Sequence, residues 1–204
     1  QSFGVNELNH LTSGPKPSYT YDDNGNLTAE SGGRTFSYDD ENQLNEVSVS
    51  GSWKQGFVYD GLGRMRVCTN FTWTGSWTVS SQTRYLYDGY RVIQERNSSA
   101  QVVATYTRGL DLSGSLEGAG GIGGLLARTD NAGSAYYHAD GGGNVTMLIN
   151  ASQQVVAKYL YDPFGHLLGS TGPLADVNTY RFSSKEYDPK TCLYYFGFRF
   201  YDPN

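Results

Sequence analysis

Carboxylate-rich and glycine-rich clusters are the parts of this sequence whose residue types and spacing could do chemistry. The segment Asp22-Asp23-Asn24-Gly25-Asn26 offers the oxygen ligands of a calcium loop. The segment Gly118-Ala-Gly-Gly-Ile-Gly123 has the glycine spacing of a dinucleotide-binding turn. The carboxylates of Asp39-Asp40-Glu41 could supply one half of a glycosidase acid pair. The first two chemistries depend on the element that comes directly after the cluster.

The neighbouring elements do not fit the first two chemistries. In the calcium candidate the glycine comes two positions too early, and no bidentate Glu closes the loop. Asp140 lies near the ribose-binding distance from the glycine-rich segment, but a pyrophosphate needs a helix start there. The residues Leu125-Leu-Ala-Arg-Thr-Asp130 predict a strand instead. We therefore predict a turn at 22–25, a loop before residue 125, and neither a bound metal nor a cofactor.

Nucleophilic chemistry has no local signature either. His10, His138 and His166 are isolated in the sequence, and no Gly-x-Ser-x-Gly elbow or cysteine-protease motif occurs. We predict no catalytic residue and expect that the chain is not an enzyme. A glycosidase acid pair stays open, because its two carboxylates can lie far apart in a sequence.

The elements that position these clusters form a repeat. Two aromatic residues flank one position, and Asp and a turn ending in Gly come next. Such an i, i+2 pair lies on one face of a strand, and Asp-x-x-Gly favours a type I turn. The unit is strand, tight turn, strand, and it must stack on its neighbours to bury its apolar face. The clearest copies use Tyr21, Asp22 and Gly25; Tyr59, Asp60 and Gly63; and Tyr161, Asp162, Pro163 and Gly165.

The spacing of the repeat favours a continuous sheet of hairpins over propeller blades. Tyr-Asp pairs begin at residues 21, 38, 59, 87, 161, 187 and 201, so their separation varies. Blades of fixed length would give a fixed period. We predict an all-β fold with no helix longer than about two turns. Sheet edges left open should pair with neighbouring repeats of the same protein or with other chains.

The amino-acid composition limits the classes of partner that the chain is expected to bind. The 204 residues include 17 Tyr and 26 Gly, only 17% are charged, and the net charge is −5. No run of Lys or Arg indicates nucleic-acid binding, and no apolar segment is long enough for a membrane span. The chain begins with Gln1 and within the pattern, so we expect a fragment of a longer chain. Cys68 and Cys192 are too few for a disulfide framework and are predicted to be free and buried.

Three tryptophans, Trp53, Trp73 and Trp77, gather in one alternating segment. Such a stripe is typical of a hairpin that buries its aromatic side chains on a sheet face. Stacking on sugar rings is the alternative, and glycans are therefore possible partners.

The C-terminal sequence resembles the RHS-repeat-associated core domain, and the upstream phrases resemble the YD repeats of the same RHS/YD proteins. The resemblance rests on Tyr161-Asp-Pro-Phe-Gly165, on Tyr180-Arg-Phe-Ser-Ser-Lys-Glu-Tyr-Asp188 and on Leu193-Tyr-Tyr-Phe-Gly-Phe-Arg-Phe-Tyr-Asp-Pro-Asn204. It gives the core motif the residues Tyr180, Arg181, Phe182, Lys185, Glu186, Tyr187, Asp188, Tyr194, Tyr195, Arg199, Tyr201, Asp202 and Pro203. Ser184 and Cys192 stand where the family phrase has Gly.

The resemblance implies a structural role. Its members form a spiralling β-sheet shell, or cocoon, that in bacteria encloses a C-terminal toxin, released after self-cleavage past the core. We expect YD-repeat hairpins over residues 1–110 and a core segment over 111–204, continuous with the same sheet. A bacterial protein of this kind is expected to be secreted or on the cell surface, with a toxin passenger as partner. A cell-surface adhesion or carbohydrate-binding module is the alternative, as in the animal teneurins, whose related shell supports adhesion; a toxic or polysaccharide-cleaving enzyme is the third.

Overall fold

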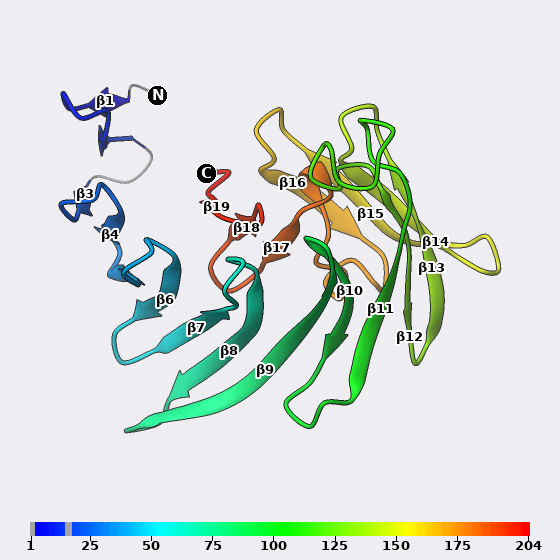
Figure 1. Ribbon diagram of the computed structural model, residues 1–204, viewed down its shortest axis with the longest axis horizontal. Helices are drawn as coiled ribbons and strands as arrows, with labels where there is room; N and C mark the ends of the chain where they lie inside the picture. Colours follow the sequence, from blue (N-terminus) through cyan, green and yellow to red (C-terminus); the bar gives the residue numbers. More distant parts are fainter. Residues whose placement is uncertain (1–2, 15–17) are drawn as a thin grey trace. The chain divides into compact units, whose positions relative to one another are not determined.

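The computed structural model describes residues 3–14 and 18–204, and nearly all of its regular structure is β-strand (Figure 1). Within these residues the only helical element is a single 3-10 turn, Phe182–Ser184. Fourteen strands, β3 to β16, succeed one another in chain order in an antiparallel sheet. The predicted all-β fold is therefore confirmed. None of the helices in the described residues has the length and apolarity needed to cross a bilayer.

The chain forms two compact units, residues 1–83 and 84–204, which we describe separately. The strands of the first unit are β1 Gly4–Val5, β2 Leu11–Ser13, β3 Tyr19–Tyr21, β4 Leu27–Glu30, β5 Arg34–Tyr38, β6 Leu44–Val49, β7 Trp53–Tyr59 and β8 Met65–Trp73. Strand β9, Trp77–Asp88, contains the division at residue 83. The boundary predicted between residues 110 and 111 separates two types of motif and stays a prediction.

The strands of the second unit continue the hairpin pattern and end in a small separate sheet. They are β10 Arg91–Arg96, β11 Val102–Arg108, β12 Leu125–Asp130, β13 Gly133–Ala139, β14 Val145–Asn150, β15 Val155–Tyr161, β16 Leu167–Thr171, β17 Glu186–Asp188, β18 Leu193–Tyr195 and β19 Phe200–Tyr201. The last three form a three-stranded sheet of their own. We refer to residues 172–204, which contain this sheet, as the C-terminal segment.

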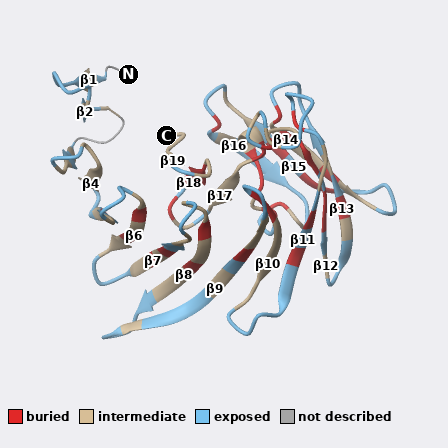
Figure 2. Cartoon of the chain, viewed as in Figure 1, coloured by how far each residue is buried: buried red, intermediate tan, exposed pale blue. Residues whose placement is uncertain are grey.

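Buried side chains of the first unit include cross-strand partners, which share one face of the sheet. Figure 2 shows buried positions on β6 and β8 of this unit. Phe36 on β5 is opposite Val47 on β6, and Val47 is opposite Gln55 on β7. These three side chains are buried. Gln55 donates a hydrogen bond from Nε2 to the buried Cys68 Sγ at 3.2 Å, which gives its amide a partner on this face. A row of cross-strand neighbours thus forms the core of this unit.

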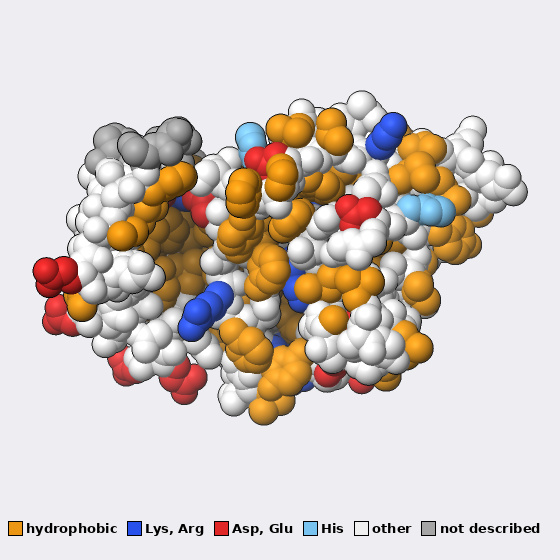
Figure 3. Space-filling view, turned by 90° about the horizontal axis from the view of Figure 1, so that it is seen from above, with side chains coloured by type: hydrophobic (Ala, Val, Ile, Leu, Met, Phe, Trp, Pro, Cys, Tyr) orange, Lys and Arg blue, Asp and Glu red, His pale blue; other side chains and the backbone are white. Residues whose placement is uncertain are grey.

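The second unit buries its sheet under the C-terminal segment. Strands β13, β14 and β15 supply a core cluster that includes Val145, Leu148 and Ala157, all inaccessible to solvent. Ala175 and Leu174 of the C-terminal segment pack on this cluster. The opposite face of the strands stays open and carries large hydrophobic side chains such as Leu160. Hydrophobic side chains also lie open on the surface seen in Figure 3.

Candidate functional site

The Asp-x-x-Gly turns share one geometry. In the turn at residues 22–25 the Gly25 N–H donates to the Asp22 carbonyl at 3.0 Å, and the Asp22 N–H donates to the Asn26 carbonyl at 3.0 Å. Asp22 Oδ1 also accepts from the backbone N–H groups of Asn24 and Asn26. A register shift accompanies the turn in the β3–β4 pair. The arrangement is a type I turn followed by a left-handed residue that forms a bulge.

The turns at Asp60 and Asp162 repeat these contacts. Gly63 N–H donates to the Asp60 carbonyl at 2.8 Å, and Gly165 N–H donates to the Asp162 carbonyl at 3.2 Å. Pro163 occupies the second turn position, where its fixed φ suits a type I turn. Gly25, Gly63 and Gly165 have φ values of +83°, +74° and +89°. Glycine adopts this region at no steric cost, so the repeat needs it there.

The turn carboxylates are held in the ionised form by their hydrogen bonds. Asp60 accepts from Arg64 Nε at 2.9 Å, and the hydrogen bonds of the Arg64 side chain lower the pKa of Asp60 to about 2. Hydrogen bonds from the Asn26 side chain likewise lower the pKa of Asp22. These carboxylates serve the turn itself, because their oxygens point at backbone N–H groups of the same turn.

Three of the repeat tyrosines connect their own turn to an earlier one. In each of these bonds a tyrosine hydroxyl donates to a backbone carbonyl. The accepting residue lies five positions after the first residue of the earlier turn. The three connections are Tyr21 to Leu11 at 3.0 Å, Tyr59 to Leu44 at 2.7 Å and Tyr161 to Val145 at 2.8 Å. The Tyr-Asp pair therefore does two things at once, since Asp shapes its own turn and Tyr fixes the register to the turn before it.

The C-terminal segment binds to three turns on one end of the second unit's sheet. These turns connect β11 to β12, β13 to β14 and β15 to β16, and their carbonyl groups accept from side chains of the segment. The bonds are Lys185 Nζ to Gly120 at 2.6 Å, Ser184 Oγ to Gly143 at 2.7 Å, Tyr194 hydroxyl to Gly165 at 3.2 Å and Tyr201 hydroxyl to Phe164 at 2.7 Å. The core motif thus recognises the backbone of the repeat turns.

Arg181 lies at the centre of the motif and is 5% exposed. Its Nε donates to the Asn178 carbonyl at 3.2 Å, and its guanidinium lies 5.3 Å from the Tyr159 ring centre and 4.8 Å from that of Tyr187. The planar cation is therefore placed between aromatic faces, which stabilise it where water is excluded. Arg181 also connects the segment to the sheet, since the Val145 N–H donates to its carbonyl at 3.0 Å.

The aromatic residues of the motif pack against repeat aromatics. The Tyr180 ring packs edge-on against Tyr106 of β11 at 4.8 Å. The ring centre of Phe182 lies 6.0 Å from that of Tyr161 of β15 and 5.9 Å from that of Tyr194 of β18. Such pairs add stability beyond the area they bury. The motif therefore continues the aromatic face of the sheet into the covering segment.

The remaining motif residues shape the segment itself. Asp188 Oδ1 accepts from the N–H groups of Lys190 and Thr191, and Asp202 Oδ1 accepts from Asn204. The Tyr195 hydroxyl donates to the Gly197 carbonyl, and the Arg199 carbonyl accepts from Phe196. Pro203 comes after β19 and is half-buried. The local bonds hold β17, β18 and β19 in their small sheet.

Ser184 and Cys192, at which the resemblance led us to expect Gly, both adopt left-handed backbone conformations. Ser184 has φ +52° and Cys192 has φ +59°, so each carries a side chain where glycine is favoured. Ser184 gains two partners there, because its Oγ donates to the Gly143 carbonyl and accepts from the Gly123 N–H at 3.0 Å. The Cys192 side chain contacts the Pro189 carbonyl through Sγ at 3.8 Å and interacts with the Tyr187 hydroxyl. Cys192 is free and exposed, which corrects the expectation that both thiols are buried; Cys68 is free and buried.

Two anchoring residues were missed by sequence reasoning. Asn178 is inaccessible to solvent, accepts from the Tyr137 hydroxyl at 2.6 Å, and donates to the Tyr159 hydroxyl at 3.2 Å and the Tyr180 carbonyl at 2.7 Å. Asp111 accepts through Oδ2 from the backbone N–H groups of Ala119 and Gly121. No local pattern marks Asn178, because all its side-chain partners except Tyr180 are distant in sequence.

The rejected glycine motif lies in the loop that Asp111 organises. Its glycines belong to the loop between β11 and β12, and the next residues form β12. Hydrogen bonds from Ser113 and from loop N–H groups lower the pKa of Asp111 to about 2. The segment is a folded loop before a strand, as predicted, rather than the start of a helix.

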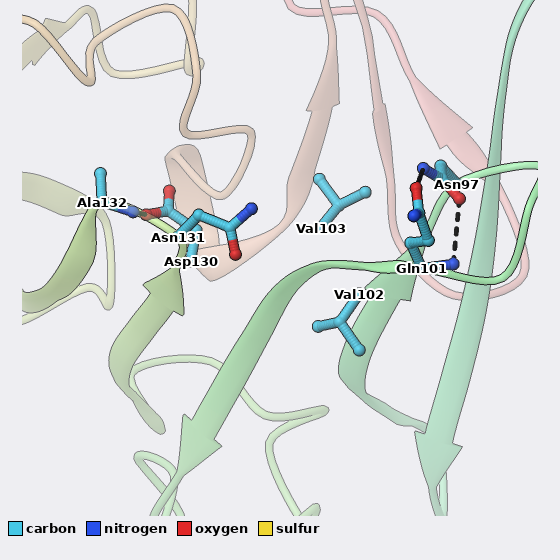
Figure 4. Close-up of a pocket in the computed structure, with 7 residues that line it drawn as sticks. All are labelled: Asn97, Gln101, Val102, Val103, Asp130, Asn131 and Ala132. Carbon is cyan, nitrogen blue, oxygen red and sulfur yellow. Dashed lines mark hydrogen bonds between the residues drawn. The ribbon is translucent and has the colours of Figure 1, made fainter.

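A hollow of about 570 Å³ lies at the other end of the same strands (Figure 4). Its lining comes from the turn between β10 and β11 and the turn between β12 and β13. The Asn97 and Gln101 amides bond to each other across their turn, with Asn97 Nδ2 3.0 Å from Gln101 Oε1. Because these amides are satisfied inside the turn, they do not converge on the hollow. Of the described residues, no group of three His, Cys, Asp or Glu side chains is placed to hold a metal ion.

Comparisons with known proteins agree on one family. The Teneurin YD-shell family matches residues 3–204. The tRNA3(Ser)-specific nuclease WapA of Bacillus spizizenii is 31% identical over 97% of this chain and 8% of its own length. Teneurin-1 of Gallus gallus is 30% identical over 90% of this chain and 6% of its own length. This chain therefore spans less than a tenth of each of these two relatives.

A solved structure supports the same fold. The crystal structure of TcdB2-TccC3-Cdc42 superimposes with a TM-score of 0.72 and 19% identity, covering 98% of this chain and 10% of that one. The family match, over residues 3–204, covers every described strand. This chain is a segment of an RHS/YD-type β-shell and belongs to the Teneurin YD-shell family.

Proposed function

We propose that this chain is part of the wall of a container that encloses a toxic enzyme encoded downstream on the same polypeptide. The observation that carries the proposal is the bonding of the C-terminal segment to three successive repeat turns. This contact makes a double-layered wall over the last repeats of the sheet. The similarity to a tRNA nuclease, which is far longer than this chain, supports a passenger with its own active site.

In this proposal the segment itself contributes no catalytic residue, and the whole protein is secreted or exposed on a bacterial cell surface. The Tyr-Asp turns and the packed aromatic face hold neighbouring hairpins together and so keep the wall of the container closed. The chemistry belongs to the passenger. The 204-residue chain should therefore be harmless when produced alone.

Protease protection of the full-length protein tests the container. We expect the region after residue 204 to resist a soluble protease in the intact protein and to be digested once the segment is loosened by Asn178→Ala. The matched control Asn26→Ala, which changes a turn in residues 1–83, should leave protection unchanged. A passenger that is digested equally in all three proteins contradicts the proposal.

A second candidate, glycan binding, is favoured by the tip of the β8–β9 hairpin. Trp73 and Trp77 pack edge-on at 5.0 Å, and Trp73 is 42% exposed. A neighbouring cation, Lys54 of β7, places its Nζ 5.5 Å from the Trp77 ring centre. No charged residue occurs in the sequence between Arg66 and Arg84, where hydroxyl, amide and aromatic side chains predominate. Such a surface suits a neutral sugar, because rings stack on the apolar faces of sugars while hydroxyl groups bond their edges.

Tryptophan fluorescence with added N-acetylglucosamine hexamer tests this candidate. We expect saturable quenching that is lost in Trp73→Ala and retained in Tyr136→Ala, which removes an exposed aromatic side chain from β13. Quenching of equal size in both variants, or none in the natural chain, counts against a glycan site at this tip.

A further inference from the structure

Two carboxyl groups are enclosed where the C-terminal segment meets the sheet of the second unit. Glu186 of β17 accepts a hydrogen bond from the Tyr85 hydroxyl of β9 at 2.7 Å. Glu95 of β10 accepts one from the Tyr106 hydroxyl of β11 at 2.7 Å. Each residue as a whole is half-buried, while its carboxyl end is surrounded by protein. In the part of the chain that the structure describes, neither carboxyl group takes part in an ion pair.

The cations nearby are engaged with other groups. Arg108 of β11 donates from Nε to the Val92 carbonyl at 3.0 Å, and its guanidinium lies 4.8 Å from the Tyr180 ring centre. Arg128 of β12 is 4% exposed and donates to Asp130 Oδ2 at 2.8 Å. The titratable and charged groups that act on the two carboxyl groups from the surrounding elements are Tyr85, Tyr106, Arg108, Arg128, Tyr137, Tyr180 and Asp188.

Enclosure makes ionisation of both groups unfavourable. Burial raises the pKa of Glu186 to about 8, and the negative charge of Glu95 adds to the effect. Burial also raises the pKa of Glu95. A carboxyl group whose pKa is raised on folding stabilises the folded form below its ordinary value, and that stability is lost as the pH rises through the raised value. For Glu186, the stability of the folded form therefore falls in the window between pH 4.5 and about pH 8.

We propose that Glu95 and Glu186 form a proton-dependent clasp that holds the C-terminal segment against the sheet. With a proton on at least one carboxyl group, the pair carries at most one negative charge. It then stays enclosed, with hydrogen bonds from the Tyr85 and Tyr106 hydroxyls. When both ionise, they repel each other, and hydration favours an opened segment. Docking of residues 172–204 is thus tight in acid and loosens toward alkaline pH, whatever the shell contains.

Hydrogen exchange between pH 5 and 9 tests the clasp in the 204-residue chain. We expect the protection of peptides from residues 172–204, corrected for intrinsic exchange, to fall as the pH rises. At full coupling to one proton the fall approaches about tenfold per pH unit within the window. Peptides from residues 34–59 serve as an internal reference and should show no such fall.

Variants assign the effect to the carboxyl groups. Glu186→Gln and Glu95→Gln should each flatten the pH dependence of the segment's protection. Glu46→Gln, which removes a carboxylate that forms an ion pair with Lys54 at 2.8 Å in the first unit, should keep the natural slope. Segment protection independent of pH in the natural chain, or an unchanged slope in Glu186→Gln, overturns the clasp.

A direct titration covers the case in which a glutamine variant does not fold. Carbon-13 NMR of glutamate carboxyl groups in the natural chain should show at least one that titrates above pH 6. Titration of every glutamate near the ordinary value would overturn the proposal without any substitution.

Discussion

The turns of residues 1–83 and those of residues 84–204 have the same local geometry but different surroundings. A Cβ added to Gly25 would lie 2.9 Å from His10 Nε2, the end of a half-buried side chain. A Cβ added to Gly165 would lie 2.6 Å from the Phe182 ring, which is held between Tyr161 and Tyr194. The comparison shows that one repeat sequence serves two purposes: it closes a hairpin everywhere, and under the C-terminal segment it is also a binding surface.

The largest effect that separates the two regions is expected from Asn178→Ala. Removing this enclosed amide leaves the Tyr137 hydroxyl and the Tyr180 carbonyl without their partner and opens a cavity. We expect a loss of about 3–5 kcal/mol of unfolding free energy for residues 84–204, measured by urea denaturation. The control Asn26→Ala in the first unit should cost less than about 1 kcal/mol. Equal losses would mean that the covering segment contributes no more than a surface turn.

Alanine at Gly165 and at Gly25 tests the comparison at matched turn positions. Both changes place a side chain at positive φ, at a cost of about 1 kcal/mol or slightly more. Only Gly165→Ala also drives a Cβ into an immobile ring, so we expect its total cost to reach about 2–4 kcal/mol. Thermal unfolding of the two variants measures the difference. If Gly25→Ala is the more damaging, the ring contact is not the deciding feature.

Glycine at residues 184 and 192 sharpens the comparison inside the segment. Cys192→Gly relieves a left-handed backbone and should stabilise the protein by about 1 kcal/mol. Ser184→Gly relieves the same strain but removes bonds to the Gly143 carbonyl and the Gly123 N–H, so we expect a net loss of about 1 kcal/mol. Denaturation midpoints of the two variants should move in opposite directions; movement in the same direction would refute the role given to the serine hydroxyl.

The smallest effect is expected in the first unit at Asp60. Its pKa is lowered from 3.8 to about 2, so its ionised form stabilises the fold above pH 3.8, and that contribution disappears as the pH falls toward 2. The carboxylate lies near solvent, and we expect Asp60→Asn to cost less than about 1 kcal/mol at pH 7. The difference between variant and natural chain should vanish at pH 2. A difference that persists there would point to a cause other than charge.

Local chemistry explains why the sheet was predictable. Asp, Gly and alternating aromatics specify a turn and its two strands within about ten residues, and the sequence pattern alone contains those features. The glycine-rich loop was also assigned correctly, because a strand pattern comes directly after it.

Long-range contacts explain what the sequence did not reveal. Asn178, Glu95 and Glu186 derive their significance from partners up to 101 residues away, such as Tyr85 for Glu186. The exposure of Cys192, which lies in the turn between β17 and β18, was likewise not evident from the sequence. A polar residue that is buried by a covering segment produces no periodic pattern in the sequence.

The tyrosine connections between turns limit how such a wall can grow. The Tyr59 and Tyr161 hydroxyls each reach a carbonyl at the same end of the sheet, and the chain returns to that end only after two strands. Gain or loss of a single strand would send the next Tyr-Asp pair to the wrong end, whereas duplication of a whole hairpin would leave every connection intact. Lengthening at the opposite end leaves these connections untouched, as the long β8–β9 hairpin illustrates. We therefore expect natural variants of this protein to differ by even numbers of strands.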